Sequence, residues 1–166
     1  IGEVLGGAAT CEAEGLLAIR DDGDGVARAI RDALADAGLA PGDVGMIVAH
    51  GNGTPQSDAS EAAALRSVFG ASMPPVTAFK WAFGHLIAAA GILDAALALA
   101  ALKQGVVPGI APLAGIAPDC AGLPLSAAAH TSPVSSVTLS SVVCQSGQSK
   151  PTVAARFASF SERASA

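Results

Sequence analysis

The sequence contains few charged and few aromatic side chains. Of its 166 residues, 14% are charged and 4% are aromatic, and the formal net charge is −5. No basic patch and no aromatic stacking surface stands out, which argues against a nucleic-acid-binding protein. Apolar residues instead make up 51% of the chain, and the mean hydropathy is +0.52. Because these values are high for a free-standing soluble domain, we expect a large interface with a partner.

Cysteine is also scarce. Cys11, Cys120 and Cys144 are odd in number, lie far apart and show no metal-ligand spacing. They therefore suggest neither a disulfide framework nor a zinc site, and they fit a reducing cytoplasm. No N-terminal signal peptide is visible. The chain starts with Ile1 rather than Met and enters a predicted strand at once, which we interpret as a piece cut from a longer polypeptide.

The most distinctive stretch of the chain is residues 77–105, TAFKWAFGHLIAAAGILDAALALAALKQG. Within residues 84–102 the only ionisable side chains are His85 and Asp94. A helix that is apolar on all sides is either buried or spans a membrane, and this run is long enough to span one. A carboxylate in its middle, however, costs roughly 2.5–3.5 kcal/mol on insertion. We therefore predict a buried helix in a soluble layered fold, with Lys80 as the nearest partner for Asp94.

Predicted strands and helices alternate along the chain, which indicates an α/β layered fold. The predicted strands are Glu3–Thr10, Val44–Ala49, Val76–Ala78, Ser136–Val143 and Thr152–Phe157, and the predicted helices other than the central one are Gly25–Ala37 and Ala59–Phe69. Asp24 is a candidate cap for the first of these helices. We predict one domain over residues 1–160 and a frayed tail over residues 161–166.

The first motif with possible chemistry follows the buried strand that ends near residue 49. It reads HGNGTP over residues 50–55, and Asp58 and Glu61 come next. The glycines allow the backbone to turn sharply and to approach a ligand closely. A histidine that leaves a buried strand is expected to have a fixed ring. On this motif alone, His50 merely ending a strand remains an alternative.

The second motif is KWAFGH, residues 80–85. Gly84 at a helix start permits close packing, and His85 is predicted to lie in the first helical turn. The positive end of the helix dipole disfavours an imidazolium there, so we expect a neutral imidazole. A core histidine bonded to a carbonyl remains the alternative for this motif alone.

The two motifs together are far more specific than either one alone. HGxGTPxxDxxE followed by KxxxGHxxxAAG resembles the C-terminal half of the β-ketoacyl-acyl-carrier-protein synthases, which are condensing enzymes with the thiolase fold. The resemblance covers essentially the whole chain and includes the GxVPG segment at residues 105–109. It implies a thiolase-like α/β fold. The chain would form one half of the duplicated layered structure, with a mixed sheet packed on a buried central helix.

The resemblance also implies roles for individual residues. In these synthases two histidines act beside a lysine, a carboxylate pairs with that lysine, two acidic residues support the first histidine, and two threonines contact the pantetheine arm. The residues that match the two histidines and the lysine are His50, His85 and Lys80, and Asp94 stands in place of the glutamate that usually pairs with the lysine. Asp58 and Glu61 match the two acidic residues. Asn52 and Thr54 match the two threonines, with Asn52 replacing one of them.

Two departures from the family pattern stand out. The nucleophilic cysteine belongs to the family's N-terminal half, and none of the three cysteines in this chain matches its motif. The family's FGFGG segment, which contributes to the oxyanion hole and gates the acyl pocket, corresponds here to residues 143–147. In that segment only Gly147 is retained, and Gln145 replaces a gating phenylalanine. These changes put the second oxyanion donor and the substrate preference in question.

The function implied by the resemblance is decarboxylative Claisen condensation of acyl and malonyl thioesters in fatty acid or polyketide synthesis. Two imidazole donors would stabilise the enolate that forms on loss of carbon dioxide. The implied partners are the N-terminal half of the synthase, an acyl carrier protein and the thioesters, in a homo- or heterodimer. We expect no metal, organic cofactor, nucleic acid or membrane. Two alternatives remain: a non-catalytic subunit like the chain-length factors, or an inactive folded fragment.

Overall fold

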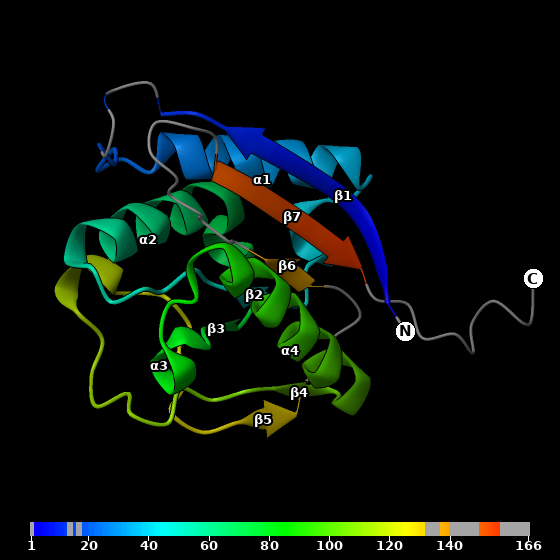
Figure 1. The fold of residues 1–166 in the computed structure, drawn as a ribbon, viewed down its shortest axis with the longest axis vertical. Coiled ribbons are helices and arrows are strands. Elements are labelled where there is room, and N and C mark those ends of the chain that lie inside the picture. Colours follow the sequence, from blue (N-terminus) through cyan, green and yellow to red (C-terminus); the bar gives the residue numbers. More distant parts are fainter. Residues whose placement is uncertain (1, 13–14, 16–17, 132–136, 140–149, 157–166) are drawn as a thin grey trace, which may run out of the picture.

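The structure, a computed structural model, describes residues 2–12, 15, 18–131, 137–139 and 150–156. The predicted tail at residues 161–166 and the segment with Gln145 and Gly147 lie outside these residues. A mixed sheet of five strands forms the centre of the fold (Figure 1), in the order β1-β7-β6-β2-β3. These strands are β1 Glu3–Thr10, β2 Met46–Val48, β3 Val76–Thr77, β6 Val137–Leu139 and β7 Lys150–Arg156.

Strand β2 is the middle of the parallel part of the sheet. Ile47 pairs in parallel with Val76 of β3 and with Thr138 of β6, whereas β7 is antiparallel to both β6 and β1. The predicted mixed sheet is thus confirmed. The predicted C-terminal strands correspond to β6 and β7, although residues 136, 140–143 and 157 of those predictions lie outside the described residues.

The remaining elements are helices and one small hairpin. The helices are α1 Asp24–Asp36, α2 Pro55–Phe69, α3 Lys80–Phe83 and α4 Ala90–Gln104, with short 3-10 turns η1 Pro41–Asp43, η2 Gly70–Ser72, η3 Ile87–Ala89 and η4 Pro118–Cys120. Strands β4 Val106–Val107 and β5 His130–Thr131 pair antiparallel in a second sheet.

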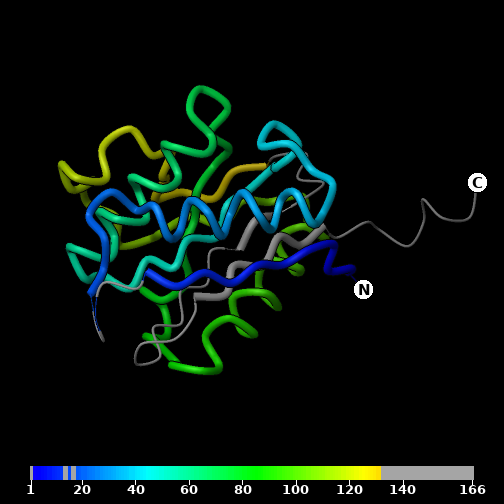
Figure 2. Tube along the Cα trace, turned by 90° about the horizontal axis from the view of Figure 1, so that it is seen from above, coloured from blue at the N-terminus to red at the C-terminus, as the bar shows by residue number. Residues whose placement is uncertain are grey.

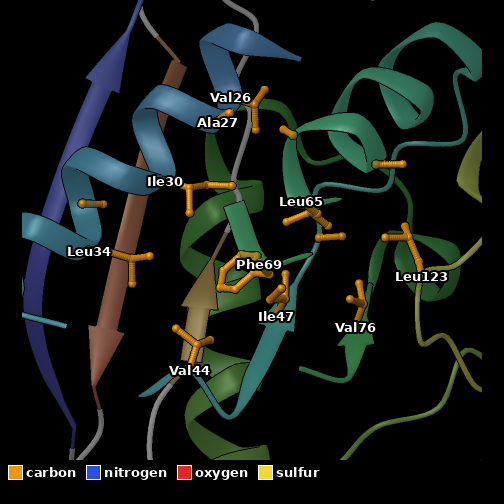
Figure 3. Packing of buried hydrophobic residues seen from close by; sticks show 14 of the residues in the cluster. Val26, Ala27, Ile30, Leu34, Val44, Ile47, Leu65, Phe69, Val76 and Leu123 are labelled. Atoms are coloured by element: carbon orange, nitrogen blue, oxygen red, sulfur yellow. The ribbon is translucent and has the colours of Figure 1, made fainter. Parts of the chain in front are cut away.

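Helices cover both faces of the large sheet (Figure 1, Figure 2). Ile47 packs with the apolar faces of α1 and α2 (Figure 3), while its neighbours Met46 and Val48 pack against α4. This alternation follows from the two-residue period of a strand, which points successive side chains to opposite faces. All three residues of β2 are buried, as expected for a parallel strand between two helical layers.

Two helix starts differ from the prediction. The cap of α1 is Gly23 in the left-handed region, and Asp24 is the first helical residue, where its carboxylate pairs with Arg28 one turn later. The prediction that Asp24 caps this helix is therefore wrong. Helix α2 begins at Pro55, four residues before the predicted start, because the fixed φ of proline suits the first helical position.

The central apolar stretch is not one helix. Gly84, with φ +76°, ends α3, and α4 starts only at Ala90. Helix α4 is buried along one stripe, which includes Asp94 and Ala98, whereas Ile92 is 80% exposed. The predicted burial on all sides is therefore wrong: the opposite face is apolar and uncovered. Residues 87–104 are long and apolar enough to cross a membrane, which is weak support for a span, and 28% of them are buried.

Candidate active site

His50 follows β2 after one residue, Ala49, and is 2% exposed. Its backbone N–H donates to Oε1 of Glu61 at 2.8 Å, and the N–H of Gly51 donates to Oε2 of the same carboxylate at 3.1 Å. Glu61 comes from α2 and is itself buried. One carboxylate therefore satisfies two consecutive amides where the strand ends, and it attaches the histidine-bearing backbone to the helix.

Residues 50–54, hereafter the His50 loop, turn sharply between β2 and α2. Gly51 and Gly53 have φ of +47° and +80°. A Cβ on Gly51 would also lie 2.9 Å from the Cβ of Ala78, so this position requires glycine for two reasons. Oδ1 of Asn52 accepts the N–H of Thr54 at 2.9 Å, a local Asx turn. Both of these candidate pantetheine contacts are exposed.

Asp58 stands in the first turn of α2, below the His50 loop. Burial raises the pKa of its carboxyl group above the ordinary value of 3.8, and the backbone N–H groups of Gly53 and Asn52 partly oppose that rise. Its Oδ1 is buried and has no hydrogen-bond partner among the described residues. The two acidic neighbours of the loop therefore differ in their surroundings. Both oxygens of Glu61 accept backbone amides, whereas Oδ1 of Asp58 accepts none among the described residues.

The ion pair between Lys80 and Asp94 is present. Nζ of Lys80 lies 2.6 Å from Oδ2 of Asp94, and the two side chains are 2% and 3% exposed. The prediction of a buried pair is therefore confirmed. The break at Gly84 allows this ion pair, because the chain turns between α3 and α4. The turn brings Lys80, at the start of α3, beside Asp94 of α4. Oδ1 of Asp94 is buried without a hydrogen-bond partner in the described part of the chain.

His85 belongs to the turn between α3 and α4, residues 84–89, hereafter the His85 turn. It is exposed and lies outside regular helix, so the prediction of a first-turn position is wrong. Its Nδ1 accepts the backbone N–H of Ile87 at 2.9 Å. Since an accepting nitrogen carries no proton, a neutral ring here carries its proton on Nε2. The alternative of a core histidine bonded to a carbonyl is therefore also wrong.

Ile87 adopts an unusual backbone conformation. Its φ is +51°, the only positive value for a non-glycine residue in the described part of the chain. A β-branched residue is strained in this region, and such strain concentrates at functional sites. The strained conformation places the Ile87 amide against the His85 ring. Nothing in the sequence signals this contact, because isoleucine is disfavoured in left-handed turns.

The structure brings the two predicted histidines together. The ring centroids of His50 and His85 are 5.0 Å apart, and the ring planes meet at 75°. The Nε2–H group that the neutral form of His85 carries is able to donate to a carbonyl oxygen or an enolate bound beside the pair. In the part of the chain that the structure describes, no group of three or more His, Cys, Asp or Glu side chains is arranged to hold a metal ion.

Residues 1–114 match the family described as "Beta-ketoacyl synthase, C-terminal domain". One curated relative is "Actinorhodin polyketide putative beta-ketoacyl synthase 2" from Streptomyces coelicolor. It is 48% identical over 92 residues, which are 55% of this chain and 22% of the relative. The chain thus spans about a fifth of the length of this relative.

Solved structures with the same fold match over nearly the whole chain. One is described as "The ishigamide ketosynthase/chain length factor"; it is 32% identical with a TM-score of 0.84, over 93% of this chain and 38% of that one. Another is described as "AntDE:AntF (apo): type II PKS acyl-carrier protein in complex with its ketosynthase bound to the hexaketide". It is 27% identical with a TM-score of 0.85, over 92% of this chain and 38% of that one.

Proposed function

Because this chain belongs to the β-ketoacyl synthase family, as its C-terminal domain, we propose that it supplies the two histidines of a condensing active site. The observation that carries the proposal is the edge-to-face pair of His50 and His85 at 5.0 Å, with the Nδ1 of His85 occupied by a backbone amide. The reaction is decarboxylative Claisen condensation of an acyl thioester with a malonyl thioester, in polyketide or fatty acid synthesis.

The proposed chemistry has two steps at these residues. The bond between the malonyl methylene carbon and its carboxylate breaks, carbon dioxide leaves, and the electron pair remains as a thioester enolate. Nε2–H donors of His50 and His85 stabilise the enolate oxygen, which is where negative charge develops. The enolate carbon then attacks the acyl thioester held on a cysteine of the N-terminal half. A carbon–carbon bond forms, the carbon–sulfur bond breaks, and the cysteine thiolate leaves.

Lys80 and Asp94 act in this proposal as positioning residues. Lys80 stands at the first position of α3, and the His85 turn begins directly after that helix. Asp94 fixes the ammonium group at 2.6 Å, away from water. The buried pair thereby anchors the start of α3, and with it the turn that carries His85.

We also propose that the N-terminal half of a synthase covers the exposed apolar surface of this chain. Large exposed apolar side chains gather on the segment from α3 to the first turn of α4: Trp81, Phe83, Leu86, Ile87 and Ile92. Such a surface is typical of an interaction site. It surrounds His85, so the covering half would also complete the active site and supply the nucleophile. A monodisperse monomer in sedimentation with no affinity for an N-terminal half would contradict this proposal.

An acyl carrier protein is the proposed donor of both thioesters, in a homo- or heterodimeric synthase in the cytoplasm. The support is one relative structure, described as an acyl-carrier protein in complex with its ketosynthase. The chain by itself is proposed to be inactive, since it contains no cysteine that matches the family's nucleophile motif.

A second candidate function is that of a chain-length-factor-like subunit. Two observations favour it: residues 143–147, VCQSG, lack the FGFGG pattern, and a related structure at 32% identity is described as a ketosynthase/chain length factor. Such a subunit would shape the product in a heterodimer without condensing thioesters itself.

Decarboxylation of malonyl-carrier protein by this chain together with its N-terminal half distinguishes the candidates. His85→Ala should lower the rate about 10²–10³-fold, the usual effect of removing one oxyanion donor, and His50→Ala should act alike. His130→Ala is the matched control, because this third histidine is exposed on β5. Wild-type rates in both site variants would contradict the enzymatic role. No decarboxylation, but a change in product length when the chain pairs with a ketosynthase, would support the second candidate.

A further inference from the structure

The His85 turn is exposed along its whole length but anchored on both sides. Residues 81–89 are all exposed, whereas the next residue, Ala90, is 2% exposed. Lys80, just before this exposed segment, and Asp94, just after it, form the buried ion pair. The structure therefore fixes the two ends of the segment and leaves the turn between them unburied.

One residue of this turn is strained. Ile87 has a φ of +51°, which is unfavourable for a β-branched residue. The hydrogen bonds at its own backbone are local: its N–H donates to Nδ1 of His85 at 2.9 Å, and its carbonyl oxygen accepts the N–H of Ala90. Because water competes for exposed hydrogen-bonding groups, these bonds offset the strain only in part.

The side chain of Ile87 offers a second way to offset the strain. It is 66% exposed, so most of its apolar surface is still available for burial, and such burial is favourable. A partner that meets this side chain while the backbone is left-handed stabilises that conformation alone. Burial by such a partner would therefore hold the amide of Ile87 against the ring of His85.

We propose that Ile87 is a positioning residue that couples docking of the N-terminal half to the tautomer of His85. With the half bound, Ile87 stays left-handed, and the proton of the neutral His85 ring stays on Nε2, where it faces the enolate. Without the half, the turn also populates a relaxed conformation in which the Ile87 amide leaves Nδ1. The ring proton then occupies either nitrogen.

The coupling rests on the proposed function, which supplies the occupant of this surface. The chain covers 38% of the related ketosynthase/chain length factor chain, so most of such a protein lies outside it. The turn carries the proposed catalytic His85, and the N-terminal half is the part that must reach this residue with its cysteine. A second copy of this chain would bring no such nucleophile.

Nitrogen chemical shifts of His85 report the tautomer directly, at alkaline pH where an ordinary imidazole is neutral. The isolated chain should show a minor form with the proton on Nδ1, in roughly a tenth of the molecules. Addition of the N-terminal half should lower that share about tenfold. His130, which is exposed on β5, shows in the same spectra how a histidine outside the turn responds.

Two variants at position 87 separate strain from burial. Ile87→Ala and Ile87→Gly both remove the side chain, but glycine alone tolerates this φ without strain. Ile87→Gly should therefore show the Nε2–H form alone, even in the isolated chain. Ile87→Ala should keep the minor Nδ1–H form and retain part of it beside the half.

Leu86→Ala is the matched control for these variants. It removes an apolar side chain of the same surface, 43% exposed, from a backbone with an ordinary φ of −86°. This change should weaken docking of the N-terminal half, as Ile87→Ala does. At saturating half, however, the tautomer change of His85 should remain complete.

Several outcomes would overturn the coupling. An unaltered chain with the Nε2–H form alone before the half is added would do so, as would Ile87→Ala with the tautomer response of the unaltered chain. Both results leave the proposed condensation standing, because decarboxylation is measured separately. Lack of binding in sedimentation would instead overturn the proposed cover and the coupling together. A tautomer change that follows the concentration of the isolated chain would identify a second copy as the occupant, against the proposal.

Discussion

The His50 loop and the His85 turn hold their histidines by different means. His50 itself is buried, and the backbone of its loop is attached to α2 through the two oxygens of Glu61. The turn is exposed, and its histidine is oriented by the amide of a residue in the same turn, Ile87. Tertiary packing within this chain is thus sufficient for His50. His85 has a locally determined orientation on a surface that is still uncovered.

This difference divides the site into a finished part and an unfinished part. The finished part lies between β2 and α2, where Ile47 and Leu65 are fully buried. The unfinished part lies along α3 and α4, where Ile92 remains 80% exposed. Behind it stands one fully buried polar contact, the Lys80–Asp94 pair. Changes at that pair, at Glu61, at Ile87 and at Asp58 test the comparison, and we describe them in order of expected effect.

The largest effect is expected at the ion pair behind the His85 turn. Lys80→Ala and Asp94→Ala should each lower the free energy of unfolding by about 3–5 kcal/mol, because each strands a buried charge. The double variant should recover part of this loss. Urea unfolding of the chain with its N-terminal half measures all three.

The exposed pair between Asp24 and Arg28, one helical turn apart, is the control for that cycle. Its removal should cost no more than about 0.5 kcal/mol. Simple additivity of the Lys80 and Asp94 variants would show that the pair does not act as a unit. The His85 turn would then lack its buried support.

The next largest effect is expected at the His50 loop. Glu61→Ala leaves the amides of His50 and Gly51 without an acceptor, at about 1–3 kcal/mol for each buried group. Hydrogen exchange should show faster exchange of both amides. Asp36→Ala is the matched control, since it removes a carboxylate that accepts the Gly7 amide at an exposed position; its effect should stay within about 0.5 kcal/mol. If Glu61→Ala and Asp36→Ala lower the free energy of unfolding equally, burial of the two amides is not the cause of the loss in Glu61→Ala.

A smaller effect, of opposite sign, is expected at Ile87. Glycine tolerates its φ of +51°, whereas a non-glycine residue there costs about 1–2 kcal/mol. Ile87→Gly should therefore stabilise the chain by up to about 1 kcal/mol, after allowance for glycine's greater freedom when unfolded. Leu86→Gly, at φ −86°, should destabilise it instead. Nitrogen chemical shifts of His85 should still report a proton on Nε2 in Ile87→Gly. A proton on Nδ1 instead would show that the isoleucine side chain is needed to hold the Ile87 amide against the His85 ring.

The smallest effect concerns pH and the carboxylate of Asp58. Burial raises its pKa above the ordinary 3.8, so the folded chain holds this proton more tightly than the unfolded chain. The resulting stability is fully present below pH 3.8 and is lost as the pH rises through the folded pKa. Relative to the unmodified chain, Asp58→Asn should therefore gain stability as the pH rises from 3.8, up to a plateau.

Asp22 should show the opposite slope in the same experiment. Its hydrogen bond with Arg20 lowers the pKa of its carboxyl group to about 2. That stability is present above pH 3.8 and is lost as the pH falls towards 2. Urea unfolding of Asp58→Asn and Asp22→Asn over a pH series compares them directly. Parallel slopes would show that the environment of Asp58 is no less polar than that of an exposed carboxylate.

Much of this was predictable from the sequence. The family membership suggested by the motifs is confirmed, as are the mixed sheet and the Lys80–Asp94 pair. A single carboxylate within an apolar run requires a partner, and Lys80 was the nearest cation. Patterns of this kind are local, so residue type and spacing are sufficient to detect them.

Other features depended on how distant segments meet. The sequence marks Glu61 as acidic but not as the acceptor for two amides at the end of β2. It marks residues 84–102 as apolar, but it does not show that α4, which begins only at Ala90, has one covered face and one open face. The left-handed conformation of Ile87 contradicts its own propensity and exists only because the surrounding turn imposes it.

The sequence by itself determined the family, the alternation of strands and helices, and the residue types of the site, because these follow from motif spacing and periodicity along the chain. Tertiary structure alone decided that the rings of His50 and His85 lie 5.0 Å apart, that Nδ1 of His85 is occupied, and that Oδ1 of Asp58 lacks a partner in the described part of the chain. These properties depend on distances and burial between elements far apart in sequence, and no local pattern encodes them.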